Sequence, residues 1–302
     1  MSTRRSFLKK SGLVLAASTL PLPYYACSKP NKKLGVALLG LGSYATNNLA
    51  PALQQTGHIE LRGIVTGSPE KIPQWQEKYG IKDENVYSYE TLPEIANNPD
   101  IDVVYIVTPT FLHKKYSVMA ANAGKHVFCE KPMAMTVEEC QEIIDACDKN
   151  GVKLAIGYRM QHEENTQTIT KWAKTQPYGP IQTVDTEVGW RIGSGGGWRL
   201  DGAKGGGAIY DMGVYNINAL RYATGLEPVS LTARHETQRP DLFLNKAPEI
   251  TWLDVEFPGG LKTTARVTYA DNVNFLKINC ENGDYELSPF QSYNGVQGST
   301  SD

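Results

Sequence analysis

The chain has no excess of either charge, because its 30 lysines and arginines are matched by 32 aspartates and glutamates, a formal net charge of -2 over 302 residues. The lack of a basic field argues against nucleic acid as a partner. We see no internal repeat and no low-complexity tract, and beyond roughly the first thirty residues no stretch is apolar enough to cross a bilayer. The length instead suits two globular domains of ordinary size.

Cysteine is also scarce, with five in the chain. Cys140 and Cys147 stand two turns apart on one expected helix, too far to bridge, and Cys129 falls in a buried-strand pattern. We therefore predict buried thiols for these residues and Cys280 rather than a disulfide framework, and we expect no metal centre.

The N-terminus carries an export pattern. Arg4 and Arg5 precede an apolar stretch over residues 12–22 that is too short to span a bilayer as a stable helix. We predict a twin-arginine leader over residues 1–32 and a periplasmic location. Cys27 leaves two interpretations open: a lipoprotein cleavage box that gives a lipid anchor, or a cysteine in a discarded peptide. Because this route carries folded proteins, a cofactor loaded before export would explain its use.

Residues 33–157 alternate short apolar runs with helix patterns. Repeated units of this kind predict a parallel, doubly wound sheet, which is an α/β Rossmann domain. The expected strands are 34–39, 59–65, 103–107, 126–129 and 153–156. The expected helices are about 44–55, one that begins at a capping Ser68 before Pro69, 112–123, and 136–150.

Residues 158–302 change rhythm, and segments with strand character dominate. This pattern predicts an α+β domain with a mainly antiparallel open sheet and helices on one face, which we expect to bind substrate and to form a homo-oligomer. The expected strands are 181–190, 229–233, 252–257, 263–269 and 274–280, and the expected helices are about 163–174 and 207–222.

A glycine-rich turn follows the first expected strand. In Gly40-Leu41-Gly42-Ser43-Tyr44-Ala45 the first glycine permits a tight turn, and the second lets the backbone approach a pyrophosphate at the helix N-terminus. Ala45 takes the third small position. The strand, turn and helix context favours a dinucleotide site over an incidental glycine turn.

The end of the second expected strand indicates which nucleotide binds. An acidic residue there would favour NAD, but the chain has Thr66 and Ser68, with Lys71 soon after. Hydroxyls and a cation suit a 2′-phosphate, so we expect NADP rather than NAD. The alternative for Lys71 is an ordinary solvated helix lysine.

Two further clusters suggest proton chemistry. Lys131, in Glu130-Lys131-Pro132, lies where a strand ends, at the edge where doubly wound sheets bind ligands. Asp211 and Tyr215 are four residues apart, so they share one helix face. Tyr215 could take a proton from a sugar hydroxyl beside a cation. Taken singly, each has an ordinary alternative: a loop lysine, a solvated acid in the first turn of a helix, and a core aromatic.

Together these residues resemble the Gfo/Idh/MocA oxidoreductase family, and within it the glucose-fructose oxidoreductase type. Tyr215 stands where many members carry histidine. The resemblance runs from about residue 34 to the C-terminus. It is carried by short segments spread along the chain, at 40–42, 123–127, 129–134, 156–159, 198–200 and 205–207.

The resemblance implies catalytic roles for Lys131, Asp211 and Tyr215, with Tyr215 transferring the proton. It also implies a tightly held NADP and a cycle in which one sugar is oxidised and another carbonyl is reduced. The full set of expected cofactor contacts includes the glycine turn and the end of the second expected strand, together with later positions: Gly40, Leu41, Gly42, Tyr44, Ala45, Thr66, Ser68, Lys71, Tyr89, Thr108, Pro109, His113, Glu130, Lys131 and Arg159.

Two departures from the family pattern stand out. Thr110 replaces a usual asparagine, which affects the expected nicotinamide contact. Similar proteins continue beyond the segment 284–287 and return C-terminal helices to the first domain. We therefore expect either a shortened chain or other contacts in their place.

Three hypotheses for function follow. The first is an exported NADP-linked enzyme that transfers hydride between a sugar or polyol carbon and its bound cofactor. The second is a nicotinamide-dependent glycoside hydrolase that acts by transient oxidation and elimination. The third is an inactive, shortened binding protein.

Overall fold

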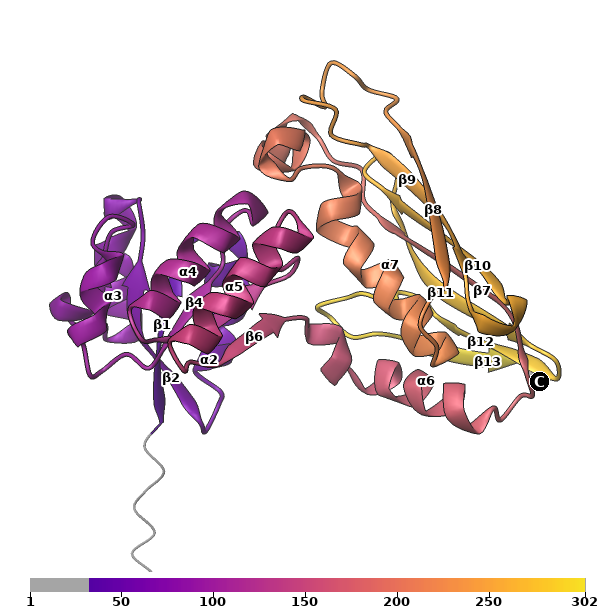
Figure 1. Ribbon diagram of the computed structural model, residues 1–302, viewed down its shortest axis with the longest axis horizontal. Coiled ribbons are helices and arrows are strands. Elements are labelled where there is room, and N and C mark those ends of the chain that lie inside the picture. The colour runs from indigo at the N-terminus through magenta and orange to yellow at the C-terminus, as the bar shows by residue number, and fades with distance from the viewer. Residues whose placement is uncertain (1–32, 302) are drawn as a thin grey trace, which may run out of the picture. The chain divides into compact units, whose positions relative to one another are not determined.

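The computed structural model describes residues 33–301 (Figure 1). The expected leader, with Arg4, Arg5 and Cys27, lies outside the described residues. From Leu34 onward the chain forms one compact unit, and it contains two sheets. Among the helices of the described part, none combines the length and the apolar character needed to span a membrane.

The first sheet is parallel throughout, with the strand order β3-β2-β1-β4-β5-β6. This is the order of a dinucleotide-binding doubly wound fold, so the predicted fold class is confirmed. The apolar runs that predicted its strands are buried, as in β1, because helices cover both faces. The strands are β1 (Leu34–Leu39), β2 (Ile59–Val65), β3 (Val86–Tyr87), β4 (Val103–Ile106), β5 (His126–Glu130) and β6 (Leu154–Gly157).

The helices of this half follow the strands as expected, with one correction. Thr136 caps α5, since its hydroxyl accepts a hydrogen bond from the Glu139 amide at 3.2 Å. The predicted cap at Ser68 is wrong, because its side chain makes no capping bond and a short 3-10 turn precedes α3. The helices are η1 (Ala45–Leu49, a π-helix), α2 (Ala50–Leu53), α3 (Ile72–Tyr79), α4 (His113–Asn122) and α5 (Val137–Lys149).

The second sheet has the order β13-β12-β11-β7-β10-β9-β8. It is mainly antiparallel, but β10 pairs with β7 in parallel, which strand patterns alone did not indicate. The chain leaves β7 through a helix and returns along β8 and β9, so β10 arrives beside β7 in the same direction. The strands are β7 (Ile181–Gly189), β8 (Ser230–Glu236), β9 (Ile250–Glu256), β10 (Lys262–Thr268), β11 (Val273–Cys280), β12 (Gly283–Leu287) and β13 (Gly298–Ser301).

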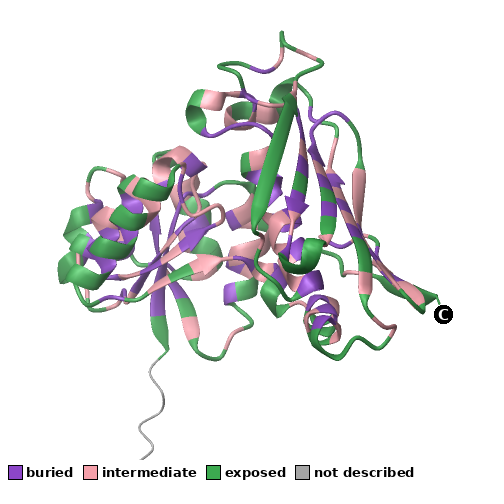
Figure 2. Cartoon of the chain, turned by 45° about the vertical axis from the view of Figure 1, so that its right-hand side comes forward, coloured by how far each residue is buried: buried purple, intermediate pink, exposed green. Residues whose placement is uncertain are grey.

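Helices α6 (Glu164–Thr175) and α7 (Ala208–Thr224) pack against each other, and α7 covers β7 and β10. Their shared apolar core includes Tyr215, Leu220 and Tyr269. β8, by contrast, is exposed along most of its length (Figure 2).

Short 3-10 segments connect the main elements. The described ones are η2 (Pro69–Lys71), η3 (Asp83–Asn85), η4 (Leu92–Asn97), η5 (Thr110–Leu112), η6 (Arg159–His162), η7 (Ser194–Leu200), η8 (Gly202–Lys204) and η9 (Pro258–Gly260).

Candidate active site

A cavity of about 820 Å³ lies where elements of both sheets meet. From the first sheet it is lined by the turn after β1, at Gly42 and Tyr44, and by the segment after β4, at Thr108. These are neighbouring strands at the point where the strand order reverses, which is the ligand-binding crevice of doubly wound sheets. From the second half it is lined by α7, at Asp211 and Tyr215.

The turn after β1 has the geometry of a phosphate-binding turn. Gly40 has φ +100°, and a Cβ on it would lie 2.8 Å from the Val107 carbonyl oxygen, so only glycine fits there. At Gly42 no atom lies within 4 Å of the place a Cβ would take, which leaves the backbone open to a ligand. The Thr108 hydroxyl is buried without a hydrogen-bond partner. An open glycine turn beside an unpaired hydroxyl fits a dinucleotide.

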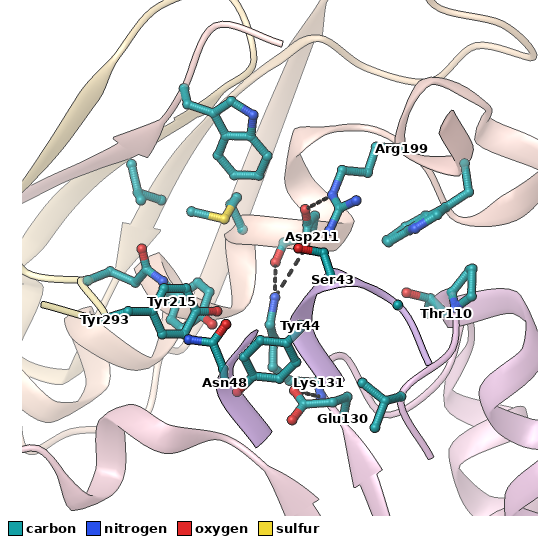
Figure 3. A pocket seen from close by; sticks show the side chains of 18 of the residues that line it. Ser43, Tyr44, Asn48, Thr110, Glu130, Lys131, Arg199, Asp211, Tyr215 and Tyr293 are labelled. Atoms are coloured by element: carbon teal, nitrogen blue, oxygen red, sulfur yellow. Dashed lines mark hydrogen bonds and ion pairs between the residues drawn. The ribbon is translucent and has the colours of Figure 1, made fainter. Parts of the chain in front are cut away.

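Lys131, at the end of β5, reaches across the cavity to Asp211 on α7 (Figure 3). Its Nζ lies 3.2 Å from Asp211 Oδ1 and 2.6 Å from the Asp211 carbonyl oxygen. Asp211 is buried, with 6 % of its surface exposed. The alternative of a solvated acid in the first turn of α7 is therefore ruled out by the structure.

Asp211 is held by two more groups. Arg199 Nε donates to its Oδ2 at 2.6 Å, and the Tyr269 hydroxyl donates to the same oxygen at 2.7 Å. Burial alone would raise the pKa of Asp211, but the charges of Lys131 and Arg199 and these hydrogen bonds hold it below its usual value. Asp211 is thus a carboxylate at neutral pH.

The same arrangement keeps Lys131 charged. Burial disfavours the ammonium, yet the attraction of Asp211 raises the pKa of Lys131 above its ordinary value. Two of its three N–H donors can serve Asp211. A third is then available to a substrate oxygen in the cavity.

Tyr215 lies one turn along α7 from Asp211 and is 3 % exposed. Lys131 Nζ stands 4.8 Å from the centre of its ring. The Tyr215 hydroxyl makes no hydrogen bond within residues 33–301, and the residue lines the cavity. The structure therefore brings together the three residues expected to be catalytic.

Glu130 and His113 line the cavity together with Lys131. Burial raises the pKa of Glu130, whose carboxylate accepts hydrogen bonds from the Tyr105 hydroxyl at 2.7 Å and the Lys131 amide at 3.3 Å. Burial lowers the pKa of His113, and its two ring nitrogens lie 2.8 Å from the carbonyl oxygens of Thr108 and Pro132. His113 thereby ties the β4 and β5 ends of the cavity together.

The other expected cofactor residues divide into two groups. Pro109 lines the cavity, and so does the buried Thr110, the residue that departs from the family pattern. The rest lie outside it, around the glycine turn, at the end of β2 and after β6: Gly40, Leu41, Ala45, Thr66, Ser68, Lys71, Tyr89 and Arg159.

The end of β2 nevertheless packs against the glycine turn. Lys71 Nζ donates to the Leu41 carbonyl oxygen at 2.9 Å, so Lys71 is not simply a solvated helix lysine. The Thr66 hydroxyl accepts a hydrogen bond from the Ser68 amide at 3.0 Å. The ammonium of Lys71 therefore lies beside the turn, and Thr66 and Ser68 lie next to each other at the end of β2.

Several lining residues were not predicted from the sequence. Five of them come from the second half of the chain and give the cavity aromatic and amide surfaces that suit a sugar: Trp190, Trp198, Asn274, Gln291 and Tyr293. Trp198 and Arg199 lie in a segment that the family resemblance had picked out, but without a role. The sequence places Tyr269 at the end of an expected strand, but a strand position does not predict its contact with Asp211.

One motif from the resemblance has a structural role instead. Lys125 is 8 % exposed and donates to the carbonyl oxygens of Asn98 and Ile101, both at 2.8 Å. It satisfies backbone acceptors just before β4, away from the cavity.

Two family models match the chain. The oxidoreductase family with an NAD-binding Rossmann fold matches residues 34–158, and the GFO/IDH/MocA C-terminal domain matches residues 166–286.

A solved aldose-aldose oxidoreductase from Caulobacter crescentus, complexed with glycerol, superposes with a TM-score of 0.85 at 40 % identity, over 89 % of this chain and 81 % of that one. An uncharacterized oxidoreductase of Rhizobium meliloti is 30 % identical over 76 % of this chain and 67 % of its own length. The NADP(+)-dependent D-xylose 1-dehydrogenase of Haloarcula marismortui is 28 % identical over 74 % of this chain, and the match spans 63 % of that enzyme. Domain models, sequence relatives and fold agree, and the chain belongs to the Gfo/Idh/MocA oxidoreductase family.

Proposed function

We propose that the chain is an exported sugar oxidoreductase that keeps NADP bound and passes hydride between the carbons of two sugars or polyols. The observation that carries the proposal is the Lys131–Asp211 ion pair beside Tyr215, in a cavity that the glycine turn also lines. The similarity to a protein named for aldose-to-aldose transfer supports this choice of substrates.

A nicotinamide nucleotide held beside Gly42, Thr108 and Glu130 would supply the hydride acceptor for the first sugar and the hydride donor for the second carbonyl. Tyr215 would take the proton of the hydroxyl on that same carbon, so that a C–H and an O–H bond break and a carbonyl forms. In the second half of the cycle Tyr215 would return the proton to the new hydroxyl. Protons and electrons then balance over one full cycle.

Lys131 has the role of orienting group. Its remaining N–H donor would hold the reacting oxygen next to Tyr215, and its charge would stabilise the negative charge that develops there. Asp211 does not accept the proton in this scheme, because its depressed pKa keeps it a carboxylate held by three donors. Its role is to fix Lys131.

The choice of NADP is supported by Lys71, Thr66 and Ser68 around the glycine turn and by the NADP(+)-dependent D-xylose relative. The proposal of export to the periplasm is supported by the N-terminal sequence pattern alone. The same holds for the fate of Cys27, which is either lipid-anchored or lost with the leader. A homo-oligomer formed through the second sheet, whose edge strand β8 is exposed, likewise rests on the sequence.

The test is to incubate the purified protein, without added cofactor, with an aldose pair and separately with a glycoside. We expect the aldose pair to give a lactone and a polyol in equal amounts. Release of free sugar from the glycoside would instead support the hydrolase that acts by oxidation and elimination. If protein that contains nucleotide acts on neither the aldose pair nor the glycoside, both the oxidoreductase and the hydrolase are refuted.

A further inference from the structure

The loop between β12 and β13 reaches back from the second sheet to the glycine turn. At its tip, the ring of Tyr293 lies 5.7 Å from the ring of Tyr44, measured between centroids. The Arg159 guanidinium lies 4.2 Å from the centre of the Tyr293 ring, and Arg159 Nη1 donates to the Ser292 carbonyl oxygen at 2.6 Å.

The base of this loop is fixed to the sheet. The Asn274 side chain on β11 accepts hydrogen bonds from the Phe290 and Gln291 amides at 3.0 Å and donates to the Gln291 carbonyl oxygen at 2.6 Å. Phe290 is buried in the core of the second half. The tip differs, because Tyr293 is 56 % exposed while also lining the cavity. The loop is therefore held at its base by Asn274, and the partly exposed ring of Tyr293 lies at the cavity wall.

Arg159, next to the ring of Tyr293, has N–H donors that are not used in hydrogen bonds. Its Nε and Nη2 atoms are buried and have no hydrogen-bond partner. Buried donors without acceptors are costly, so an oxygen acceptor that reached them would be bound favourably. The phosphates and carboxamide of a dinucleotide carry such oxygens.

We propose that Tyr293 retains the nucleotide, by closing the cavity wall between the glycine turn and Arg159 so that the ligand leaves only when this ring moves. The inference rests on the proposed function, in which the nucleotide stays bound through two half-reactions. It adds a residue from the second half of the chain to a site whose nucleotide contacts were expected only in the first half and at Arg159.

The experiment measures how fast NADPH leaves the full-length holoprotein. Protein preloaded with NADPH is mixed with excess NADP, and the loss of bound NADPH fluorescence gives the release rate. Tyr293→Ala should release NADPH about tenfold faster, since stacking and cation–π contacts of this kind contribute about one factor of ten. Tyr293→Phe keeps the ring and should release it at the wild-type rate.

Tyr210→Ala is the matched control, because Tyr210 is also an exposed tyrosine, at 38 %, but does not line this cavity. Comparing the melting temperatures of nucleotide-free Tyr293→Ala and nucleotide-free wild type measures any loss of folding stability, and so separates retention from folding. Equal release rates for Tyr293→Ala and wild type would overturn the inference and leave the proposed function intact. Failure of the wild-type protein to bind NADPH would overturn both.

Discussion

Lys131 and Asp211 are 80 positions apart in the chain, yet the Lys131 ammonium donates to both the carboxylate and the carbonyl oxygen of Asp211. Lys131 directly follows a strand of the first sheet, and Asp211 lies in the first turn of the helix that covers the second sheet. The ion pair thus fixes the two halves of the cavity to each other. It also divides the chemistry, because Asp211 is committed to holding Lys131 and proton transfer is left to Tyr215.

Replacing the Tyr215 hydroxyl should stop turnover and leave nucleotide binding unchanged. We expect Tyr215→Phe to lower kcat by about 10²- to 10⁴-fold, the range typical of a lost general acid–base group. Tyr222→Phe is the control, because Tyr222 is on the same helix and does not line the cavity. Steady-state kinetics with an aldose pair measure both variants. A wild-type rate for Tyr215→Phe would eliminate this proton path.

The Asp211 carboxylate should stabilise the fold above its unfolded pKa. A carboxyl whose folded pKa is depressed contributes stability above its ordinary pKa of 3.8, and the contribution is lost as the pH falls toward the folded value. Asp211→Asn should therefore cost about 3–5 kcal/mol near neutral pH, the usual cost of breaking a buried pair.

Urea unfolding at a series of pH values tests this linkage. The difference between wild type and Asp211→Asn should stay constant at neutral pH and shrink once the pH drops below 3.8. Asp254→Asn, at an exposed position of β9, should show little effect. A difference that grows with acidity would contradict the assigned ionisation.

Tyr269 should act through Asp211 rather than on the substrate. Tyr269→Phe removes one of the two donors to Asp211 Oδ2, so Lys131 loses part of its orientation. We expect kcat to fall roughly ten- to hundredfold while KM changes little, because small displacements of a reacting group have effects of this size. Tyr285→Phe, a buried tyrosine outside the cavity, should keep the wild-type kcat. Equal kcat values for the two variants would show that Tyr269 does not support catalysis through Asp211.

Lys71 should distinguish the two nicotinamide cofactors. If its ammonium binds the 2′-phosphate, Lys71→Ala should weaken NADP by about 10- to 100-fold, as expected for a charged hydrogen bond, and leave NAD affinity unchanged. Lys78→Ala, in α3 close by, is the control. Isothermal titration of nucleotide-free protein gives both affinities. An equal loss for NADP and NAD would argue against phosphate recognition.

The first sheet could be predicted closely, because its strands are buried on both faces and give continuous apolar runs. The second strand was expected at 59–65 and is found at Ile59–Val65. The two-residue strand β3 was missed, because a segment of two residues is too short to show an alternation of apolar and polar residues. The parallel pairing of β7 and β10 was missed because alternation shows which residues form a strand, but not in which direction it pairs.

The site could be predicted only where local pattern and resemblance agreed. Lys131, Asp211 and Tyr215 each had an ordinary alternative, and only their three-dimensional contact removes it. Tyr269 and Tyr293 follow no motif, because their roles depend on contacts with residues far away in the chain. Residues of this kind are visible only once the fold is known.

The most direct measurement is the absorbance spectrum of the purified mature protein, recorded without added cofactor and then during titration with an aldose. The band of reduced nicotinamide should rise in proportion to protein as the aldose is added, and fall when a second carbonyl sugar follows. Protein that contains no nucleotide and takes up neither NADP nor NAD on incubation would contradict the account.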